Sequence, residues 1–597
     1  MEKQRLAVFI ALSALILFGS QFLFQKLNPP PQKPANEQLA QTATPTAAPT
    51  IAPTQIPPPV QSANATQADA REIKITTPFW TGTLSNQGAV ITEFTMTHLP
   101  NDDGKLGKPI DALPGGGGGV LLVSAQKSKE IGAPLRLLIP SDRNLEKQLN
   151  EARFLVADSS EQQVVLDEAA SKTITLNYDN GSGVKAQKIF SFNGTGYDFD
   201  CTVDVRRNDQ AIETYLVVGP GFGDQNVKNP GGYYSQESLA TISSATGIDR
   251  HAGKSIEGTE PKPVATTQVR WASIDDNYFA MAVIPSSPAK AVSLLNARHK
   301  EIIDGKEQEI NQVSAAVEIT NAQVNHIYAG PKNIKMLSAV SQKFNLGDDS
   351  GNLERAVNYG WSWITPVVKP LAWVMLTILQ KIYKVTQNYG WAIIVLTFSL
   401  NMCFFPMRWY SSVSMKKAAA MQPKMKDVQE RMKKLDKNDP KMVELQKEQV
   451  ALMREGNPLL GCLPLLLQMP FFYAVYAVLT TAVEIRHTGF MGWVKDLAAP
   501  DPFYILPVVF VISMIVQQAL TPSTADPMQK KVQYIMPLFM GYIFIHAPAG
   551  LVMYWMVGNL VGIGQQYIIN RVSPAPPAQV IGDKPAPLQT KKSLRSN

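Results

Sequence analysis

Cysteine and histidine are scarce in this chain of 597 residues, which holds three cysteines and six histidines. The cysteines, Cys201, Cys403 and Cys462, lie far apart, and two of them fall inside apolar segments. This spacing indicates neither a disulfide framework nor a zinc site. The sequence also lacks a nucleophile–base pattern, a nucleotide-binding motif and paired acids inside its apolar runs. We therefore expect no catalytic residue, no metal and no cofactor, and the chain is not predicted to be an enzyme.

A strong excess of charge is absent as well. The formal net charge is +7, and the basic residues concentrate beside apolar runs instead of forming one patch. Direct binding of nucleic acid is therefore not expected. The apolar content of 45% averages over polar and near-lipidic segments. This uneven distribution predicts a soluble portion and a membrane portion in one chain.

The first residues are typical of a membrane anchor. Lys3 and Arg5 precede an apolar run that is long enough to span a bilayer, and small residues do not mark a clean cleavage site after it. We therefore favour an uncleaved anchor over residues 1–27, rather than a signal peptide, with its start in the cytoplasm. Residues 28–70 are rich in Pro, Thr, Ala and Gln, which predicts a disordered tether.

Residues 71–345 change to short alternating runs, such as KTITLNY and YDFDCTVDV, that are separated by turn residues. This pattern predicts a β-sandwich domain, which the anchor would place on the periplasmic side of the membrane. A glycine run at 114–120 lacks the Lys-Ser/Thr pair of a phosphate-binding loop and is interpreted as a flexible hairpin loop.

The remainder is predicted to be helical and membrane-bound. Residues 346–389 mix Trp, Pro and Lys, which favours an amphipathic helix lying in the interface. A core over 390–571 then follows, with expected spans at 390–409, 459–481, 503–520, 534–547 and 550–570. The predicted fold class is thus a polytopic α-helical membrane protein, with an N-terminal anchor, a five-helix core and a periplasmic β-sandwich.

Most Lys and Arg residues of this half fall in the loops 410–458 and 521–533 and in the tail 572–597. The positive-inside rule places these segments, and both termini, in the cytoplasm. Residues 411–457 show two apolar stripes separated by KNDP, which predicts a helical hairpin. Two interpretations of this hairpin remain open: a solvated connector, or a docking arm for cytosolic partners.

Uncharged polar residues recur at helical spacing inside the expected spans. Thr397, Asn401 and Arg408 share one helical face, and Ser513 and Gln517 lie one turn apart. Trp555, Asn559, Gly562 and Gln566 form a further stripe at spacings of 4, 3 and 4. Interhelical hydrogen bonds, worth about 0.6 to 2 kcal/mol each, account for any single residue. A shared hydrated cavity accounts better for the whole set.

The segments NPLLGCLPLLLQMPFFYAVYAVL, TADPMQKKVQYIMPLF and PAGLVMYWMVGNLVGIGQQYII follow an FFP segment and MQPKMKDVQERM in this order. Over residues 350–571 they closely resemble the YidC membrane-protein insertase family. The anchor, the tether, the β-rich segment and GPKNIKML at 330–337 fit the Gram-negative form of that family. The resemblance implies a bacterial inner-membrane protein with a polar groove that is open to the cytoplasm and to lipid and closed toward the periplasm. Insertion there needs no nucleotide hydrolysis.

The resemblance also implies roles for particular residues. The groove or substrate-contacting surface is assigned to Thr397, Asn401, Gln468, Ser513, Gln517, Tyr554 and Trp555. Met469, Phe472 and Met514 are assigned to an apolar slide for the substrate, with ordinary packing as the alternative. The family carries an arginine five residues before the proline that corresponds to Pro406, whereas this chain has Asn401 there. Arg408 either supplies charge at the groove mouth or reaches to the interface.

Nascent membrane-protein substrates and the lipid bilayer are the partners that the resemblance implies. The Sec translocon, the ribosome and the signal-recognition receptor are further candidates, and action alone or beside the translocon stays open. Two other functions were weighed. A small-solute transporter with a periplasmic binding domain would be expected to show duplicated spans, which the sequence lacks. An envelope scaffold would tolerate leucine in the polar stripes.

Overall fold

The computed structural model describes residues 69–101, 106–111, 117–158, 162–225, 237–258, 260–265, 267–303, 306–347, 351–359, 364–435, 439–456, 463–523 and 527–574. The expected anchor, almost all of the tether, most of the basic tail and Cys462 lie outside these residues. The described chain forms two compact units. The β unit runs to Asn358 and also includes Thr480–His487, whereas the helical unit comprises Tyr359–Leu479 and the residues from Thr488 onward.

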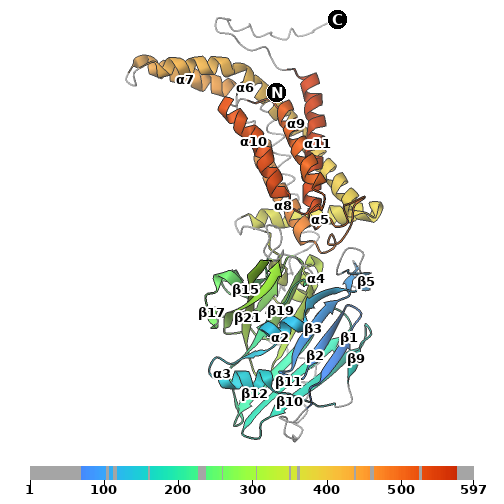
Figure 1. Cartoon of the computed structure of the whole chain (residues 1–597). Coiled ribbons are helices and arrows are strands. Elements are labelled where there is room, and N and C mark those ends of the chain that lie inside the picture. Colours follow the sequence, from blue (N-terminus) through green and yellow to red (C-terminus); the bar gives the residue numbers. More distant parts are fainter. Residues whose placement is uncertain are drawn as a thin grey trace, which may run out of the picture. The chain divides into compact units, whose positions relative to one another are not determined.

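The β unit is built from three larger sheets and one small one (Figure 1). The first sheet has the order β6 (Val120–Val123), β3 (Val90–Met96), β2 (Trp80–Ser85), β1 (Glu72–Thr76) and β9 (Gln163–Val165). The second has the order β16 (Gly247–Ala252), β15 (Leu239–Ser244), β18 (Trp271–Asp275), β19 (Phe279–Pro285), β22 (Val324–Pro331), β12 (Asp198–Arg207), β11 (Val184–Asn193), β10 (Ser171–Asp179) and β8 (Leu155–Val156), with β13 (Gln210–Ala211) beside β12.

The third sheet has the order β17 (Lys262–Ala265), β20 (Val292–Ile303), β21 (Lys306–Ile319), β14 (Thr214–Val218) and β7 (Leu137–Leu138), and β4 (His98–Pro100) pairs with β5 (Leu106–Pro109). The helices of this unit are short: α2 (Ala125–Ile131), α3 (Arg143–Glu151), α4 (Ile334–Lys343), η2 (Gly253–Ser255) and η3 (Leu353–Ala356). The predicted β-rich domain is confirmed.

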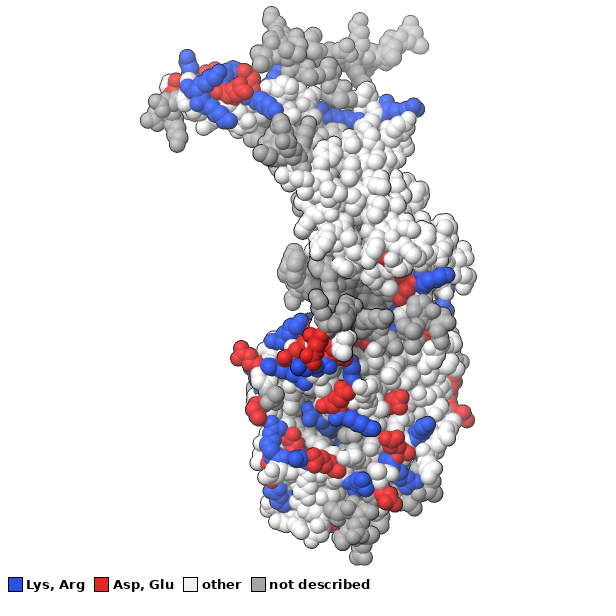
Figure 2. All heavy atoms as spheres, in the orientation of Figure 1, with Lys and Arg blue, Asp and Glu red and all other residues white. Residues whose placement is uncertain are grey.

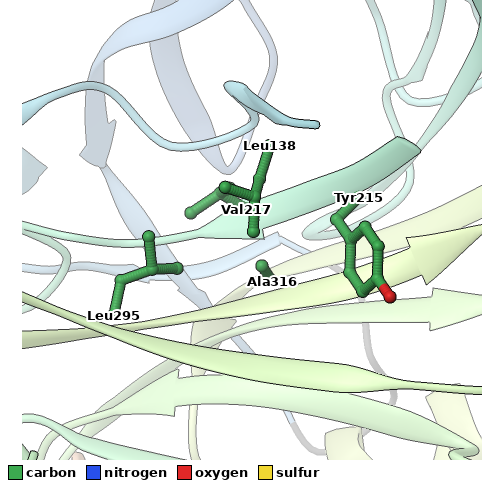
Figure 3. Packing of buried hydrophobic residues seen from close by; sticks show 5 residues of the cluster. All are labelled: Leu138, Tyr215, Val217, Leu295 and Ala316. Carbon is green, nitrogen blue, oxygen red and sulfur yellow. The ribbon is translucent and has the colours of Figure 1, made fainter. Parts of the chain in front are cut away.

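Alternation along the strands determines which side chains reach the core. Every second residue of β11 is buried, from Val184 to Phe192, and β11 pairs antiparallel with β12. The third sheet contributes a cluster in which Leu138, Val217, Leu295 and Ala316 pack with the ring of Tyr215 (Figure 3). Burial of such apolar faces supplies the main stabilisation of the unit.

One inward position of β11 holds a charged residue. The side chain of Lys188 is fully buried, and its ammonium donates hydrogen bonds to the carbonyl oxygens of Gly88, Ala89 and Leu135 at 2.8, 3.0 and 2.8 Å. Burial lowers the pKa of Lys188 from 10.5 to about 8. The lysine thus joins two loops to the strand at the cost of a desolvated charge.

The helical unit contains α5 (Thr365–Thr386), α6 (Tyr389–Lys433), α7 (Pro440–Gly456), α8 (Leu463–Thr481, whose last two residues belong to the β unit), α9 (Ile505–Leu520), α10 (Pro527–Phe544) and α11 (Ala549–Val572). The predicted helical C-terminal half is confirmed. α6 is one continuous helix of 45 residues that includes the first expected span and the first arm of the hairpin. Among the described residues, α6 is long and apolar enough to cross a membrane, and shorter apolar helices lie at Leu467–Thr481, Ile505–Leu520 and Val532–Phe544.

Candidate functional site

Helix α11 packs against both α6 and α9 in the helical unit. A Cβ atom added to Gly550, near the start of α11, would lie 3.4 Å from Cδ1 of Ile393 on α6. Near the end of α11, the ammonium of Lys416 on α6 donates to the carbonyl oxygen of Ile569 at 3.1 Å. α6 and α11 therefore run parallel over roughly six turns, so that their residues can be compared level by level.

Two buried hydrogen bonds join the three helices near the middle of α11. The side chain of Asn559 donates to Ser513 Oγ on α9 at 3.2 Å. The side chain of Gln565 donates to the backbone carbonyl of Asn401 on α6 at 3.0 Å. The stripe on α11 that was predicted from its spacing thus faces α6 and α9.

Arg408 and Gln517 approach each other over a glycine. A Cβ atom added to Gly562 would lie 2.5 Å from Arg408 Nη1 and 2.5 Å from Gln517 Nε2. Arg408 Nη1 also donates to Gln565 Oε1 at 3.1 Å. The absence of a side chain at Gly562 therefore makes the space in which a cation from α6 and an amide from α9 meet.

A second polar level lies closer to the end of α11. Gln566 Nε2 donates to Ser412 Oγ on α6 at 2.9 Å and to Asn570 Oδ1 at 2.9 Å. Asn570 Nδ2 donates in turn to the carbonyl oxygen of Leu520, the last residue of α9, at 3.1 Å. Sequence reasoning missed Ser412, Asn570 and Lys416. The spacing of four residues from Arg408 to Ser412 to Lys416 is the signal that could have found two of them.

Thr397 and Asn401 bond mainly within their own helix. Thr397 is 0% exposed and donates to the carbonyl oxygen of Ile393 at 2.6 Å, while Asn401, which is 5% exposed, donates to that of Thr397 at 2.8 Å. A Cβ atom added to Gly558 would lie 3.7 Å from Asn401 Nδ2 and 3.9 Å from Cγ2 of Thr397. Both residues therefore face α11 beside Gly558.

Aromatic side chains from three helices surround Trp555, which lies on α11. Its ring lies 4.7 Å from the ring of Phe472 on α8, 5.9 Å from that of Phe510 on α9 and 4.9 Å from that of Phe544 on α10. We call these four residues the aromatic layer. Because Trp555 precedes Asn559 by one turn, the layer lies next to the polar contacts, toward the start of α11. Of the other assigned residues, Tyr554 is buried, Gln468 and Met514 are half-buried, and Met469 is 38% exposed.

A loop covers the start of α11. The carbonyl oxygens of Ala499 and Leu497 accept hydrogen bonds from the backbone N–H groups of Ala549 and Gly550 at 2.7 and 2.8 Å. Asp501, which is buried, accepts from the N–H groups of Phe503 and Leu506 before and within the first turn of α9. These bonds satisfy N–H groups that a helix start would otherwise leave unpaired.

The exposed surface of α9 and α10 is rich in apolar side chains. Figure 2 shows almost no charged side chains over the visible face of α8 to α11, whereas Lys and Arg, with Asp and Glu among them, gather over α7 and the end of α6. Large exposed apolar residues on α9 and α10 include Val508, Ile512, Val516, Ile535, Leu538 and Phe539. Among the described residues, no cluster of three His, Cys, Asp or Glu side chains could hold a metal ion.

The family models and the curated relatives indicate one family. The family model described as "60Kd inner membrane protein" matches residues 381–576, and the one described as "YidC periplasmic domain" matches residues 72–374. A protein of Ralstonia nicotianae called "Membrane protein insertase YidC" is 30% identical, over 95% of this chain and 96% of its own length.

A protein of the same description from Geobacter metallireducens is 28% identical, over 96% of this chain and 98% of its own length. Among solved structures, one described as "Active YidC insertase crystal structure with the first transmembrane domain resolved" is 15% identical. It covers 84% of this chain and 93% of its own, with a TM-score of 0.32.

Proposed function

The chain belongs to the YidC family of membrane protein insertases, and on that premise we propose that the faces of α6, α9 and α11 around Gly562 form the groove that receives the polar end of a substrate. The protein inserts nascent membrane proteins into the inner membrane, and its partners are the nascent chain and the bilayer.

The main observation in support of the groove is the environment of Arg408. Arg408 is half-buried, its guanidinium donates to the neutral amide of Gln565, and it makes no ion pair with the acidic residues that the structure describes. Holding an unpaired cation even partly out of water costs free energy, so such residues inside membrane proteins mark functional sites. An acidic group on the substrate supplies the missing countercharge, and the amide of Gln565 exchanges its present partners for substrate groups.

Polarity at this level reduces the barrier to insertion. A polar chain end that crosses hydrocarbon loses its hydrogen bonds to water, which costs several kcal/mol for each group. A groove that is hydrated from the cytoplasm to Gly562 shortens the dry part of that path. Partition of the apolar segment of the substrate into lipid then supplies the driving force, without nucleotide hydrolysis.

The proposal includes a topology. α6, α8, α9, α10 and α11 cross the bilayer, the hairpin of α6 and α7 and both termini lie in the cytoplasm, and the β unit lies in the periplasm. The basic residues over the hairpin support this orientation. The same hairpin is the proposed contact for the ribosome and the signal-recognition receptor, and cooperation with the Sec translocon belongs to the proposal.

The test uses the full chain in proteoliposomes. Insertion is scored for a short single-span substrate with an acidic translocated end and for a matched substrate whose end is neutral. Arg408→Gln is expected to lower insertion of the acidic substrate about tenfold, as expected for the loss of a charge-assisted bond of about 1.5 kcal/mol or more. Insertion of the neutral substrate changes little. Arg571→Gln is the matched control, because Arg571 stacks on the ring of Tyr567 in the last turn of α11, away from Gly562.

Two further variants test the position at which the family carries arginine. Asn401→Leu is expected to lower insertion of both substrates, since it removes polarity next to Gly558. Asn401→Arg is expected to raise insertion of the acidic substrate alone. Equal insertion of the acidic substrate by the native chain and by Arg408→Gln, in folded preparations, refutes the assignment of Arg408 to the groove.

A further inference from the structure

The aromatic layer closes the bundle where the polar contacts end. α8, α9, α10 and α11 each contribute one ring, and the rings of Phe510 and Phe544 also contact each other, with their centroids 5.0 Å apart. Phe510 is 0% and Phe544 3% exposed. On α6 and α8, the rings of Phe404 and Phe471 meet edge to face at 5.0 Å. α6, α8, α9, α10 and α11 therefore each supply at least one ring to the aromatic layer or to the Phe404–Phe471 contact, and α8 supplies one to each.

A second closure lies beyond the layer, at the start of α11. The loop after α8 is held to α11 by the backbone bonds from Ala549 and Gly550, and it buries the side chains of Val494 and Leu497. Backbone groups here are paired with each other, so this end offers water few binding partners. The polar contacts around Gly562 lie on the opposite side of the rings.

We infer that the aromatic layer is the permeability barrier of this protein, a seal that stops protons and other ions from following water through the bundle. The inference rests on the hydrated groove proposed above, because only a bundle that is wet on one side needs a seal inside it. Trp555 precedes Gly562 by seven residues of helix, which is a rise of about 10 Å. A groove hydrated as far as Arg408 therefore leaves only the rings and the loop as a dry path.

Rings suit this role because they fill volume and offer water no strong hydrogen-bond partner. Loss of one phenyl ring would leave a cavity, and a cavity needs polar partners as well as room before it holds water. A serine in place of phenylalanine supplies both. A leucine supplies neither and fills much of the same space.

The experiment measures proton entry into sealed proteoliposomes that contain the full chain and a trapped pH-sensitive dye, under a potassium diffusion potential. Phe510→Ser and Phe544→Ser are expected to raise the rate several-fold over the native chain. Phe539→Ser is the matched control, because Phe539 lies on the same helix as Phe544 but is 58% exposed. It is expected to match the native rate, and so is Phe544→Leu.

The inference is overturned if Phe510→Ser and Phe544→Ser, incorporated as monodisperse protein, are as tight as the native chain. It is also overturned if Phe539→Ser leaks equally, because leakage would then reflect general loosening of the helices. Phe510→Ala and Phe544→Ala are milder changes in case serine prevents folding, and the same order of rates is expected.

The same vesicles separate this inference from the proposed groove. Arg408→Gln is expected to insert the acidic substrate poorly while its vesicles stay tight. Leakage through the serine variants together with unimpaired insertion by Arg408→Gln would remove the groove assignment of Arg408 and leave the seal. Poor insertion by Arg408→Gln together with tight serine variants would remove the seal and leave the groove assignment of Arg408.

Discussion

Replacing Lys188 by methionine tests the energetics of the β unit. The unfolded chain keeps the proton of this lysine up to its ordinary pKa of 10.5, whereas the folded chain releases it at about pH 8. Between these two values the unfolded state binds more protons, so the free energy of unfolding rises with pH. Since one pKa unit corresponds to about 1.4 kcal/mol, the full rise is roughly 3 kcal/mol.

Lys188→Met removes the titrating group and is expected to remove that rise. At neutral pH the substitution has two opposing effects on stability. Methionine needs no desolvation of charge, but it leaves the carbonyl oxygens of Gly88, Ala89 and Leu135 without their donor, at about 1 to 3 kcal/mol each. The difference between native chain and variant therefore grows by roughly 3 kcal/mol toward pH 10.5.

The assay is urea unfolding of the full chain in detergent micelles, followed by brief proteolysis that cleaves only the unfolded β unit, from neutral pH to about pH 10.5. Lys185→Met is the control. Lys185 lies on the outward face of the same strand, and its ammonium pairs with Asp209 at 3.5 Å. Its variant should keep the pH dependence of the native chain. An identical slope in Lys188→Met would refute the reasoning, because the slope would then arise from other groups.

Three further substitutions test contacts of the helical unit. Gly390→Ala places a Cβ atom 2.1 Å from Cδ2 of Phe490 and should lower stability by about 1 to 3 kcal/mol in detergent. The loss should be smaller when Phe490→Ala is also present, because the clash is then removed. Additive effects of the two substitutions on the free energy of unfolding would contradict this. Asp501→Ala removes the acceptor of two N–H groups and should speed hydrogen exchange at the start of α9, measured by mass spectrometry. Lys416→Met frees the carbonyls of Ile569 and Ser573 and should speed exchange in the last turn of α11, where unchanged exchange would exclude a capping role.

Much of the β unit was predictable because strand alternation is a local property. The run KTITLNY predicts which residues of β10 point inward, and the structure follows that pattern. Alternation cannot explain why Lys188 is tolerated at an inward position of β11. Its three acceptors lie 53 to 100 residues away in the sequence, in loops that only the folded unit brings to the strand. A lysine on an inward position is therefore interpretable only with its neighbours in space.

The candidate site was likewise predictable only in part. The spacing of Trp555, Asn559, Gly562 and Gln566 predicts one face of a helix, and that face meets α6 and α9. Spacing within one helix carries no information on the register between helices. It could not show that Arg408 reaches Gln565, or that Lys416 bonds the end of α11. The aromatic layer was missed for that reason, since Phe472, Phe510, Phe544 and Trp555 come from four separate helices.

The two explanations of the polar stripe, hydrogen bonding between helices and a hydrated groove, apply to different levels of the same helices. Asn559 with Ser513 and Gln566 with Ser412 bond in pairs, which holds α11 to α9 and to α6. Between these pairs, Gly562 contributes no side chain, and a cation stands beside neutral amides. Pairing above and below holds the helices together, while the ends of Arg408 and Gln517 occupy the space over Gly562. In the proposed groove, helix packing and substrate binding are then not competing uses of the polar residues, because different levels of the same helices serve them.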